Sequence, residues 1–261
     1  MKLRFLGTGT STGVPQLRCT CPTCLSSDSH DRRLRCSAFL HGDHGERILI
    51  DCGPDFYRQM LTMPRDTGID TLLLTHQHYD HVGGIDDLRP YCRRDEHFPI
   101  YCQWDVERDL RARMPYAFKE NPYPGVPHLK FVEIEPHRPF RVGDIEVLPV
   151  PVNHYKLNIV GFRFGRSLAY ITDAKEVPQS TVDALAGVDT LVINALRLEE
   201  HVSHMSLEQA LDVIRRVAPR RSFLTHVSHG MPPVAEASRL LPENVKFAYD
   251  GLEITVAAHP G

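Results

Sequence analysis

The segment Thr75–His81 concentrates side chains that bind metal ions, in the pattern His-x-His-x-Asp-His. The metal-binding types within it are His76, His78, Asp80 and His81. Imidazole nitrogens and carboxylate oxygens at this density suit borderline metals such as Zn, Mn, Fe, Co or Ni. A polar loop whose histidines merely face solvent is the alternative, but it does not account for so many ligating groups together. The sequence therefore predicts a metal site directly after the apolar run Thr71–Leu74.

Further polar residues elsewhere in the chain also follow short apolar runs. They are Asp51, His154, Asp173 and His226. Taken singly, each could be a buried polar side chain satisfied by ordinary hydrogen bonds. Their shared position at the carboxyl end of a strand predicts that they converge, because sites form on that side of an open α/β sheet. Leu74-Thr75-His76 and Leu224-Thr225-His226 even repeat the same passage from strand to ligand.

A second cluster holds three of the seven cysteines, Cys19, Cys21 and Cys24. An odd cysteine total without an export signal argues against a disulfide framework and favours metal binding or free thiols. Structural zinc needs four ligands in a tetrahedron. We expect His229 to be the fourth, because it lies just beyond His226 and would point away from the other site. Reduced surface thiols are the alternative. The remaining cysteines are expected to be packing residues: Cys36, Cys52, Cys92 and Cys102.

Short runs rich in Val, Ile and Leu, bounded by Gly, Pro and Asp, predict the strands that must position these groups. The residues from Met1 to Gly7 alternate apolar and charged side chains and predict a first strand. The later runs are Arg47–Asp51, Thr71–Thr75, Ile145–Val152, Ala169–Thr172, Thr190–Ile193, Ser222–Thr225 and Glu253–Val256.

Helical patterns lie between some of these strands, which indicates an α/β layered domain. Ser206–Val217 is expected to be a helix with Ser206 as its N-cap and Gln209 closing a capping box. Pro54–Met63 and Asp86–Arg93 are further helix candidates. The proline-rich stretch Met114–Pro127 is expected to be a loop with short helical pieces.

Charge and composition exclude several classes of protein. The 261 residues carry 30 basic and 33 acidic side chains, with a net charge of −3, so a nucleic-acid ligand that needs a global basic excess is disfavoured. With 42% apolar residues the chain can bury a sizeable core, and we expect one domain over residues 1–261. No apolar run approaches the roughly 18 residues of a membrane span, and no signal-peptide pattern is present. A cytoplasmic protein without membrane contact is expected.

The order His76-x-His78-x-Asp80-His81, then His154, Asp173 and His226, resembles the metallo-β-lactamase superfamily over nearly the whole chain. The resemblance implies an αββα sandwich with a two-metal site along one edge of the sheets. It implies one metal held by His76, His78 and His154, and a second held by Asp80, His81 and His226. Asp173 would bridge both metals. Asp51 corresponds to the first acidic motif of the superfamily and is expected to orient a ligand histidine.

The Gly7-Thr8-Gly9 start and the cysteine cluster narrow the resemblance to the phosphoribosyl cyclic phosphate phosphodiesterase family of the carbon–phosphorus lyase pathway. That family binds a structural zinc with three cysteines and a histidine, which correspond to Cys19, Cys21, Cys24 and His229. A further histidine of the family helps at the phosphate; His204 matches it best, and His201 is the alternative. His204 and Asp80 are therefore the candidate catalytic residues. The Gly7–Gly13 segment offers N–H groups and hydroxyls near a phosphate, although a plain tight turn is the simpler explanation.

We therefore expect a metal-dependent phosphodiesterase that hydrolyses a small, cyclic ribosyl-type phosphodiester with a hydroxide activated by two divalent metals, Zn or Mn. One structural Zn completes the expected cofactors. A lactonase or thioesterase of the same fold is the alternative enzyme, and a non-catalytic accessory protein like the pyrroloquinoline quinone biosynthesis B protein is the alternative outside enzymes. The tRNA 3′-processing endonucleases share the ligands, but the chain has no basic tract for tRNA. Phe98, Tyr101 and Trp104 are candidates for a homodimer contact, with a satellite core as the other explanation.

Overall fold

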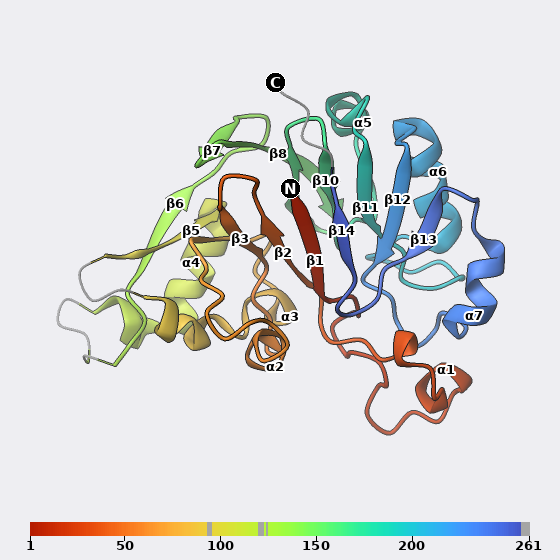
Figure 1. Cartoon of the computed structure of the whole chain (residues 1–261), viewed down its shortest axis with the longest axis horizontal. Coiled ribbons are helices and arrows are strands. Elements are labelled where there is room, and N and C mark those ends of the chain that lie inside the picture. The colour runs from red at the N-terminus through yellow and green to blue at the C-terminus, as the bar shows by residue number, and fades with distance from the viewer. Residues whose placement is uncertain (93–95, 120–122, 124, 257–261) are drawn as a thin grey trace.

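Two seven-stranded sheets stack face to face, and helices cover the outer face of each (Figure 1). The computed structural model describes residues 1–92, 96–119, 123 and 125–256. The strand order is β14-β1-β2-β3-β4-β5-β6 in the first sheet and β13-β12-β11-β10-β9-β8-β7 in the second. This architecture is the αββα sandwich, so the predicted layered α/β fold is confirmed.

Each sheet combines antiparallel and parallel pairs. The strands of the first sheet are β1 Lys2–Gly7, β2 Ser37–His41, β3 Arg47–Ile50, β4 Thr71–Leu73, β5 Phe98–Cys102, β6 Leu129–Glu133 and β14 Glu253–Thr255. The strands of the second sheet are β7 Phe140–Val142, β8 Ile145–His154, β9 Leu157–Phe164, β10 Leu168–Tyr170, β11 Thr190–Asn194, β12 Arg221–Thr225 and β13 Val245–Phe247.

The helices are short apart from α4 and α6. The α-helices are α1 Pro22–Leu25, α2 Phe56–Met60, α3 Tyr79–Val82, α4 Trp104–Arg113, α5 Gln179–Leu185, α6 Leu207–Val217 and α7 Val234–Ala237. Turns of 3₁₀-helix cover Ser29–Asp31, Ile85–Tyr91, Pro115–Phe118 and Ser238–Leu240. Within the described residues no helix has the length and apolar character needed to cross a bilayer.

Both faces of the central strands are buried, which explains their nearly continuous apolar sequence. In β3, Ile48 and Ile50 pack into the space between the sheets, while Leu49 packs under the helices with Phe56 of α2. The second sheet repeats this alternation, because Leu191 of β11 packs in the cluster that also contains residues of α5 and α6. The sandwich therefore has a core between its sheets and one further core beneath each helical layer.

The predicted helix Ser206–Val217 is observed as α6, with the Ser206 and Gln209 side chains forming the expected capping box. Of the predicted helix Pro54–Met63, the structure forms only the shorter helix α2, Phe56–Met60. Asp86–Arg93 is a 3₁₀-helix, Ile85–Tyr91, because in an α-helix the ring of Pro90 would clash with the carbonyl four residues earlier; Arg93 lies outside the described residues. Part of Met114–Pro127 is the short 3₁₀-helix Pro115–Phe118, while residues 120–122 and 124 lie outside the described ones.

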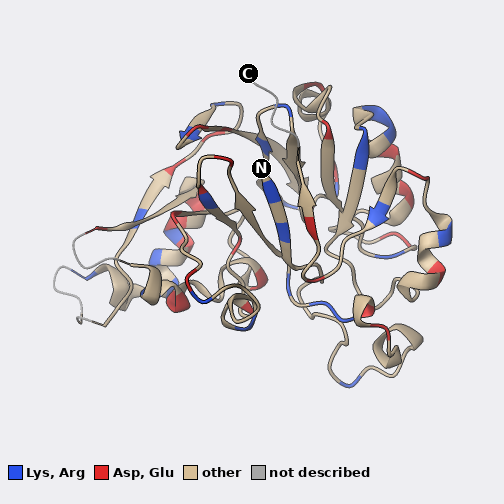
Figure 2. Cartoon of the chain, in the orientation of Figure 1, with Lys and Arg blue, Asp and Glu red and all other residues tan. Residues whose placement is uncertain are grey.

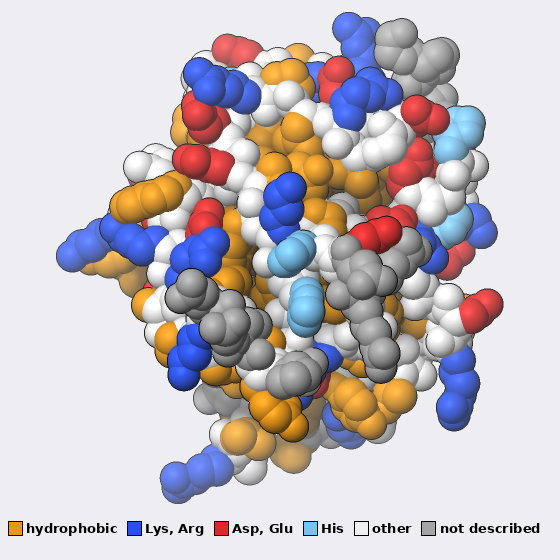
Figure 3. All heavy atoms as spheres, turned by 90° about the vertical axis from the view of Figure 1, so that its left-hand side faces the viewer, with side chains coloured by type: hydrophobic (Ala, Val, Ile, Leu, Met, Phe, Trp, Pro, Cys, Tyr) orange, Lys and Arg blue, Asp and Glu red, His pale blue; other side chains and the backbone are white. Residues whose placement is uncertain are grey.

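The three aromatic candidates for a dimer contact lie in different environments. Phe98 is buried in the core beneath the first helical layer. Tyr101 stacks on Phe140 with ring centroids 4.6 Å apart. Trp104 is 56% exposed and packs under the Arg108 guanidinium. Figure 3 views the side where β6 and β7 end the two sheets, and hydrophobic side chains lie among charged ones on this face.

Charged side chains of both signs are spread over the outer elements (Figure 2). Acidic and basic residues alternate along α4, where Glu107 pairs with Arg111 and Asp109 pairs with Arg113. This interspersed pattern agrees with the small net charge of −3.

Candidate active site

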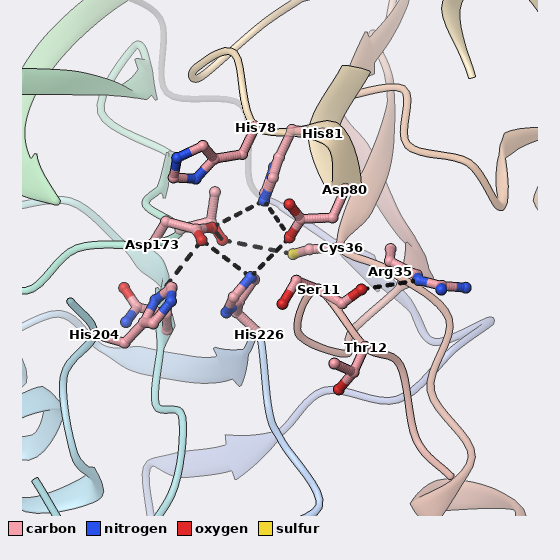
Figure 4. Close-up of polar contacts among 12 residues, drawn as sticks. Ser11, Thr12, Arg35, Cys36, His78, Asp80, His81, Asp173, His204 and His226 are labelled. Carbon is pink, nitrogen blue, oxygen red and sulfur yellow. Dashed lines mark hydrogen bonds and ion pairs between the residues drawn. The ribbon is translucent and has the colours of Figure 1, made fainter. Parts of the chain in front are cut away.

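The sequence-predicted ligands meet at one edge of the sandwich, where strands of both sheets end. From the first sheet, His76 and His78 follow β4, and Asp80 and His81 lie on α3. From the second sheet, His154 is the last residue of β8, Asp173 follows β10, and His226 follows β12. His204 lies in the segment between β11 and α6. The structure therefore brings together residues from position 76 to position 226. Figure 4 labels His78, Asp80, His81, Asp173, His204 and His226 among them.

Three strand-end residues of this site adopt the left-handed backbone conformation. The φ angles of Asp51, Asp173 and His226 are 58°, 58° and 55°. A left-handed residue other than glycine costs roughly 1–2 kcal/mol, and such strain collects at functional sites. The turn that it creates directs each side chain out of its strand toward the shared edge.

One group of donors consists of three imidazoles. The Nε2 atom of His76 lies 3.0 Å from Nδ1 of His78, and Nε2 of His154 lies 3.3 Å from the same Nδ1 atom. Burial, reinforced by the charge of His81, holds the pKa of His76 well below its usual value. A neutral imidazole keeps the lone pair that a metal needs, so these three nitrogens fit one metal ion.

The second group combines two carboxylates with two imidazoles. His81 Nε2 lies 3.2 Å from both Asp80 Oδ2 and Asp173 Oδ2. His226 Nε2 lies 3.0 Å from Asp173 Oδ1 and 3.6 Å from Asp80 Oδ2. Burial opposes a charge on His226, but the charge of Asp173 outweighs burial and raises the pKa of His226 to about 10. The carboxylates thus create a field that attracts positive charge, which a divalent cation would satisfy.

Unpaired nitrogen atoms support a metal-binding role for this group. Among the described residues, the buried His81 Nε2 and both ring nitrogens of His226 lack a hydrogen-bond partner. Buried polar atoms in proteins are normally paired. Nitrogens that point at carboxylate oxygens without a hydrogen bond fit a set of ligands around a cation.

A surrounding layer of hydrogen bonds fixes the ligand side chains. Asp51 Oδ2 accepts a 2.7 Å hydrogen bond from Nδ1 of His81, as the resemblance implied. The same carboxylate accepts hydrogen bonds from the Thr75 N–H and hydroxyl. His154 Nδ1 donates to the Ser203 carbonyl at 2.7 Å, which leaves its Nε2 atom directed at the site. Such partners set the tautomer and the orientation of a ligand histidine.

Two positioning groups around Asp173 were not predicted from the sequence. The Thr172 hydroxyl donates to Asp173 Oδ2 at 2.6 Å. Asn194, at the end of β11, bonds both the N–H and the carbonyl of Ala174. The repeated Thr-His signal at the ends of β4 and β12 could have pointed to Thr172, which occupies the same place before Asp173. Asn194 carries no such signal.

The structure also distinguishes His204 from His201. The His204 Nδ1 atom lies 3.7 Å from Asp173 Oδ1, and its ring stacks on that of His226 with centroids 4.8 Å apart. Burial and the charge of His226 lower the pKa of His204 to about 3. The ring of His201 lies outside this layer, 5.3 Å from that of His204. Of the two histidines, His204 is therefore the one that lies beside Asp173.

The cysteine cluster forms a separate group with the expected fourth member. His229 Nδ1 lies 3.2 Å from Cys19 Sγ and 3.6 Å from Cys21 Sγ, and Cys24 completes the set. Burial opposes ionisation of Cys21, but hydrogen bonds from the Cys24 N–H and from His229 outweigh it and lower the pKa to about 6. Burial raises the pKa of Cys24 to about 11. Three sulfurs and one imidazole nitrogen are a donor set typical of structural zinc.

Comparison with known proteins defines the class. Residues 46–227, more than half of the chain, match the family model of the β-lactamase superfamily domain. The chain belongs to this superfamily, and its fold and donor sets are those of a metal-dependent hydrolase that binds divalent metal.

Particular relatives refine this assignment. A solved diphosphatase of the PhnP family is 35% identical, covers 97% of each chain and superposes with a TM-score of 0.89. An octanoyltransferase of Porphyromonas gingivalis is 43% identical over 98% of this chain, which spans 52% of that protein. The chain thus covers about half the length of that relative. The coenzyme PQQ synthesis protein B of Cupriavidus taiwanensis is 26% identical over 97% of this chain and 99% of its own length. The protein is thus a metallo-β-lactamase superfamily hydrolase related to the PhnP family.

Proposed function

We propose that this chain is a phosphodiesterase that hydrolyses a small, cyclic ribosyl-type phosphodiester. The observation that carries the proposal is the position of Asp173, which lies in one donor group with Asp80, His81 and His226 and in another with His154 and His204. The solved relative is named a diphosphatase, and that name supports phosphoryl rather than acyl chemistry.

The two donor groups would each hold one divalent metal. His76, His78 and His154 would bind the first, Asp80, His81 and His226 would bind the second, and Asp173 would contact both. When bound, such a pair supplies Lewis acidity at the phosphoryl group and activates water at neutral pH. Zn and Mn both suit mixed nitrogen and oxygen donors.

The residues of the chain would supply orientation and a proton. Asp51 and the Ser203 carbonyl hold His81 and His154 in the required tautomers. His204, whose ring lies beside Asp173, would donate a proton to the leaving oxygen in its imidazolium form, whereas burial and the charge of His226 favour the neutral ring before substrate binds. An approaching phosphate anion would raise the pKa of this histidine and favour proton transfer.

Hydrolysis of bis-p-nitrophenyl phosphate by the metal-loaded protein tests the proposal. We expect turnover by the wild type and its loss in His76→Ala and Asp173→Ala, each of which removes a metal donor. Ser180→Ala on the exposed start of α5 is the control and should match the wild type. Normal turnover by either folded ligand variant would contradict the proposed site.

Metal content is the second test, because the cysteine cluster is proposed to hold a structural Zn. Elemental analysis should find about three metal ions per chain, and the triple variant Cys19→Ser, Cys21→Ser, Cys24→Ser should lose one of them. The proposed zinc would join the loop before α1 to the segment after β12. One metal ion per chain that disappears with the cysteines would instead favour an accessory protein without turnover.

Acyl transfer is the second candidate, because one relative carries the name octanoyltransferase. A thioesterase or lactonase of this fold would cleave p-nitrophenyl octanoate or octanoyl thioesters faster than phosphodiesters. The two substrate classes can be compared with one preparation, and a higher kcat/KM for carbonyl esters would replace the phosphodiesterase proposal.

The remaining expectations also stand as proposals. Residues 1–261 would form one domain that acts on a small molecule in the cytoplasm, where thiols stay reduced and available to zinc. A homodimer through the face that exposes Trp104 would be detected by analytical ultracentrifugation.

A further inference from the structure

The segment between β1 and α1 runs beside the end of β12, where His226 lies. Thr10 N–H donates to the Val227 carbonyl at 3.1 Å, and Val227 N–H donates to the Thr8 carbonyl at 2.9 Å. Gly9 lies between these two bonds, and a Cβ atom there would come within 2.9 Å of Arg33 Cβ. The glycine therefore lets this segment pack closely against Arg33 while its neighbours pair with Val227 beside His226.

Thr10–Gly13 is a β-turn whose tip carries Ser11 and Thr12. Gly13 N–H donates to the Thr10 carbonyl at 2.8 Å, which closes the turn. Both tip residues are exposed. Among the hydrogen bonds of the described residues, the backbone N–H groups of Ser11 and Thr12 have no acceptor. In Figure 4 the Ser11 hydroxyl points toward His226 and Asp80, whereas the Thr12 side chain points away.

Hydrogen bonds of the Arg35 side chain hold this turn in place. Arg35 Nε donates to the Ser11 carbonyl at 3.2 Å, and Arg35 Nη1 is fixed by Asp55 at 3.1 Å. The Ser11 carbonyl and the Thr12 N–H belong to one peptide group. A hydrogen bond from a cation to that carbonyl polarises the peptide and makes the Thr12 N–H a stronger donor. The guanidinium of Arg35 is already paired with Asp55. Arg35 therefore polarises the peptide between Ser11 and Thr12 rather than acting as a free cation.

We propose that the Thr10–Gly13 turn is a phosphate cradle, in which the Ser11 hydroxyl and the N–H groups of Ser11 and Thr12 bind a non-bridging phosphoryl oxygen of the substrate. The inference rests on the proposed phosphodiesterase function and assigns residues to substrate binding. Consecutive N–H groups that point outward from a turn bind anions. Placed beside a site of phosphoryl transfer, such donors stabilise the charge that develops on the phosphorus oxygens.

Two substitutions at Ser11 separate its donors. Ser11→Ala removes only the hydroxyl. Ser11→Pro also removes the N–H, and proline suits this second position of a turn. A hydrogen bond to a charged group corresponds to roughly 10- to 100-fold in binding. We therefore expect kcat/KM for bis-p-nitrophenyl phosphate to fall about 10-fold in Ser11→Ala and about 100-fold in Ser11→Pro.

Binding of inorganic phosphate to the metal-loaded protein, measured by calorimetry, provides a readout that does not need turnover. The affinity for phosphate should fall in Ser11→Ala and fall further in Ser11→Pro. Elemental analysis should find unchanged metal content in both variants, and circular dichroism should find an unchanged fold. Asp43→Pro is the matched control. It places proline at the second position of the Gly42–Gly45 turn, which joins β2 to β3 at the end of the sheet away from the site. This control should keep wild-type phosphate affinity and turnover.

The outcomes distinguish the cradle from the proposed function. Phosphate affinity and kcat/KM within twofold of wild type in both Ser11 variants would overturn the cradle and leave the phosphodiesterase intact. A wild type without phosphodiesterase activity would overturn the proposed function. In that case the cradle is supported only if the wild type still binds phosphate and Ser11→Pro weakens that binding. It is overturned if the wild type and Ser11→Pro bind phosphate equally, or if neither binds it.

Discussion

Asp51 shows how a residue that touches no substrate can govern the site. It is fully buried and adopts a left-handed backbone conformation with φ of 58°. Its carboxylate receives hydrogen bonds from His81 Nδ1 and from the N–H and hydroxyl of Thr75. One side chain therefore orients a proposed metal ligand and also fixes the end of β4, from which His76 and His78 follow.

Asp51→Asn is expected to lower metal affinity and hydrolytic activity by roughly 10- to 100-fold, because the amide cannot accept hydrogen bonds at both of its terminal atoms. Elemental analysis after dialysis and the rate with bis-p-nitrophenyl phosphate measure the two effects. Asp70→Asn, at a surface ion pair with Arg47, is the control. A variant that keeps full metal content and the wild-type rate would show that Asp51 does not orient a ligand.

At the scale of single residues, the sequence predicted which side chains come together, but few of the groups that hold them in place. Histidine and aspartate at strand ends are conspicuous by type, and all the proposed ligands converge. The Ser203 carbonyl could not be predicted, because every residue has a carbonyl and only the fold places this one against His154. Asn194 was missed for a similar reason, since its role depends on the path of the neighbouring strand.

At the scale of elements, Glu46 connects two hairpins that lie far apart in the sequence. It precedes β3, and Oε1 accepts a 3.0 Å hydrogen bond from Asp144 N–H in the turn between β7 and β8. Oε2 accepts a 3.3 Å hydrogen bond from His44 N–H. The carboxylate thus joins an end of the first sheet to an end of the second.

Glu46→Gln should destabilise the fold by about 1–2 kcal/mol at pH 7, because a buried charged acceptor becomes neutral. Burial opposes ionisation of Glu46, but the N–H groups of Asp144 and His44 outweigh it and lower the pKa. The stabilisation is present above the ordinary pKa of 4.5 and is lost as the pH falls through the lower folded value.

Urea unfolding at pH 7 and at pH 3.5 measures this dependence. The difference between wild type and Glu46→Gln should be largest at pH 7 and shrink at pH 3.5. Glu135→Gln, at an exposed ion pair with Arg138, should change stability by less than about 0.5 kcal/mol at either pH. An equal effect of Glu46→Gln at both pH values would assign its role to packing rather than charge.

Two elements that the sequence did not predict, α4 and β9, show two different physical reasons. Helix α4 buries only Val106 and Leu110, and most of its other residues are charged, so its apolar stripe is narrow. Strand β9 contains Gly161, where a Cβ atom would lie 2.8 Å from the Tyr170 carbonyl. In the sequence, a glycine at this position suggests a turn. In the fold, it allows β9 to approach the neighbouring strand β10 closely. Strands with uninterrupted Val, Ile and Leu were predicted within a few residues.

At the scale of the whole molecule, the return of the chain to the first sheet joins its two halves. Strand β14 lies in the first sheet and pairs with β1, although the strands immediately before it, β7 to β13, all belong to the second sheet. The core between the sheets draws Phe5 and Ile50 from one sheet and Phe162 and Tyr170 from the other. Neither sheet can bury its inner face alone.

We therefore expect one cooperative unfolding transition for the metal-loaded protein. The single Trp104 on α4 reports on the first helical layer, whereas far-ultraviolet circular dichroism reports on all elements. Their urea transitions should coincide. Chelation should shift both to lower urea together, since metal bound only to the folded state stabilises it. Two separate transitions would divide the chain into independent domains.

The β1–β14 pairing also has a consequence for synthesis on the ribosome. Lys2 of β1 pairs with Thr255 of β14, so β1 is made long before its partner strand. One edge of the first sheet therefore stays unpaired until β14 has emerged. During that interval β1 exposes backbone groups that could pair with another nascent chain. The sheet is thus vulnerable to misassembly until β14 is made, and chaperone capture of nascent chains should persist until β14 is free.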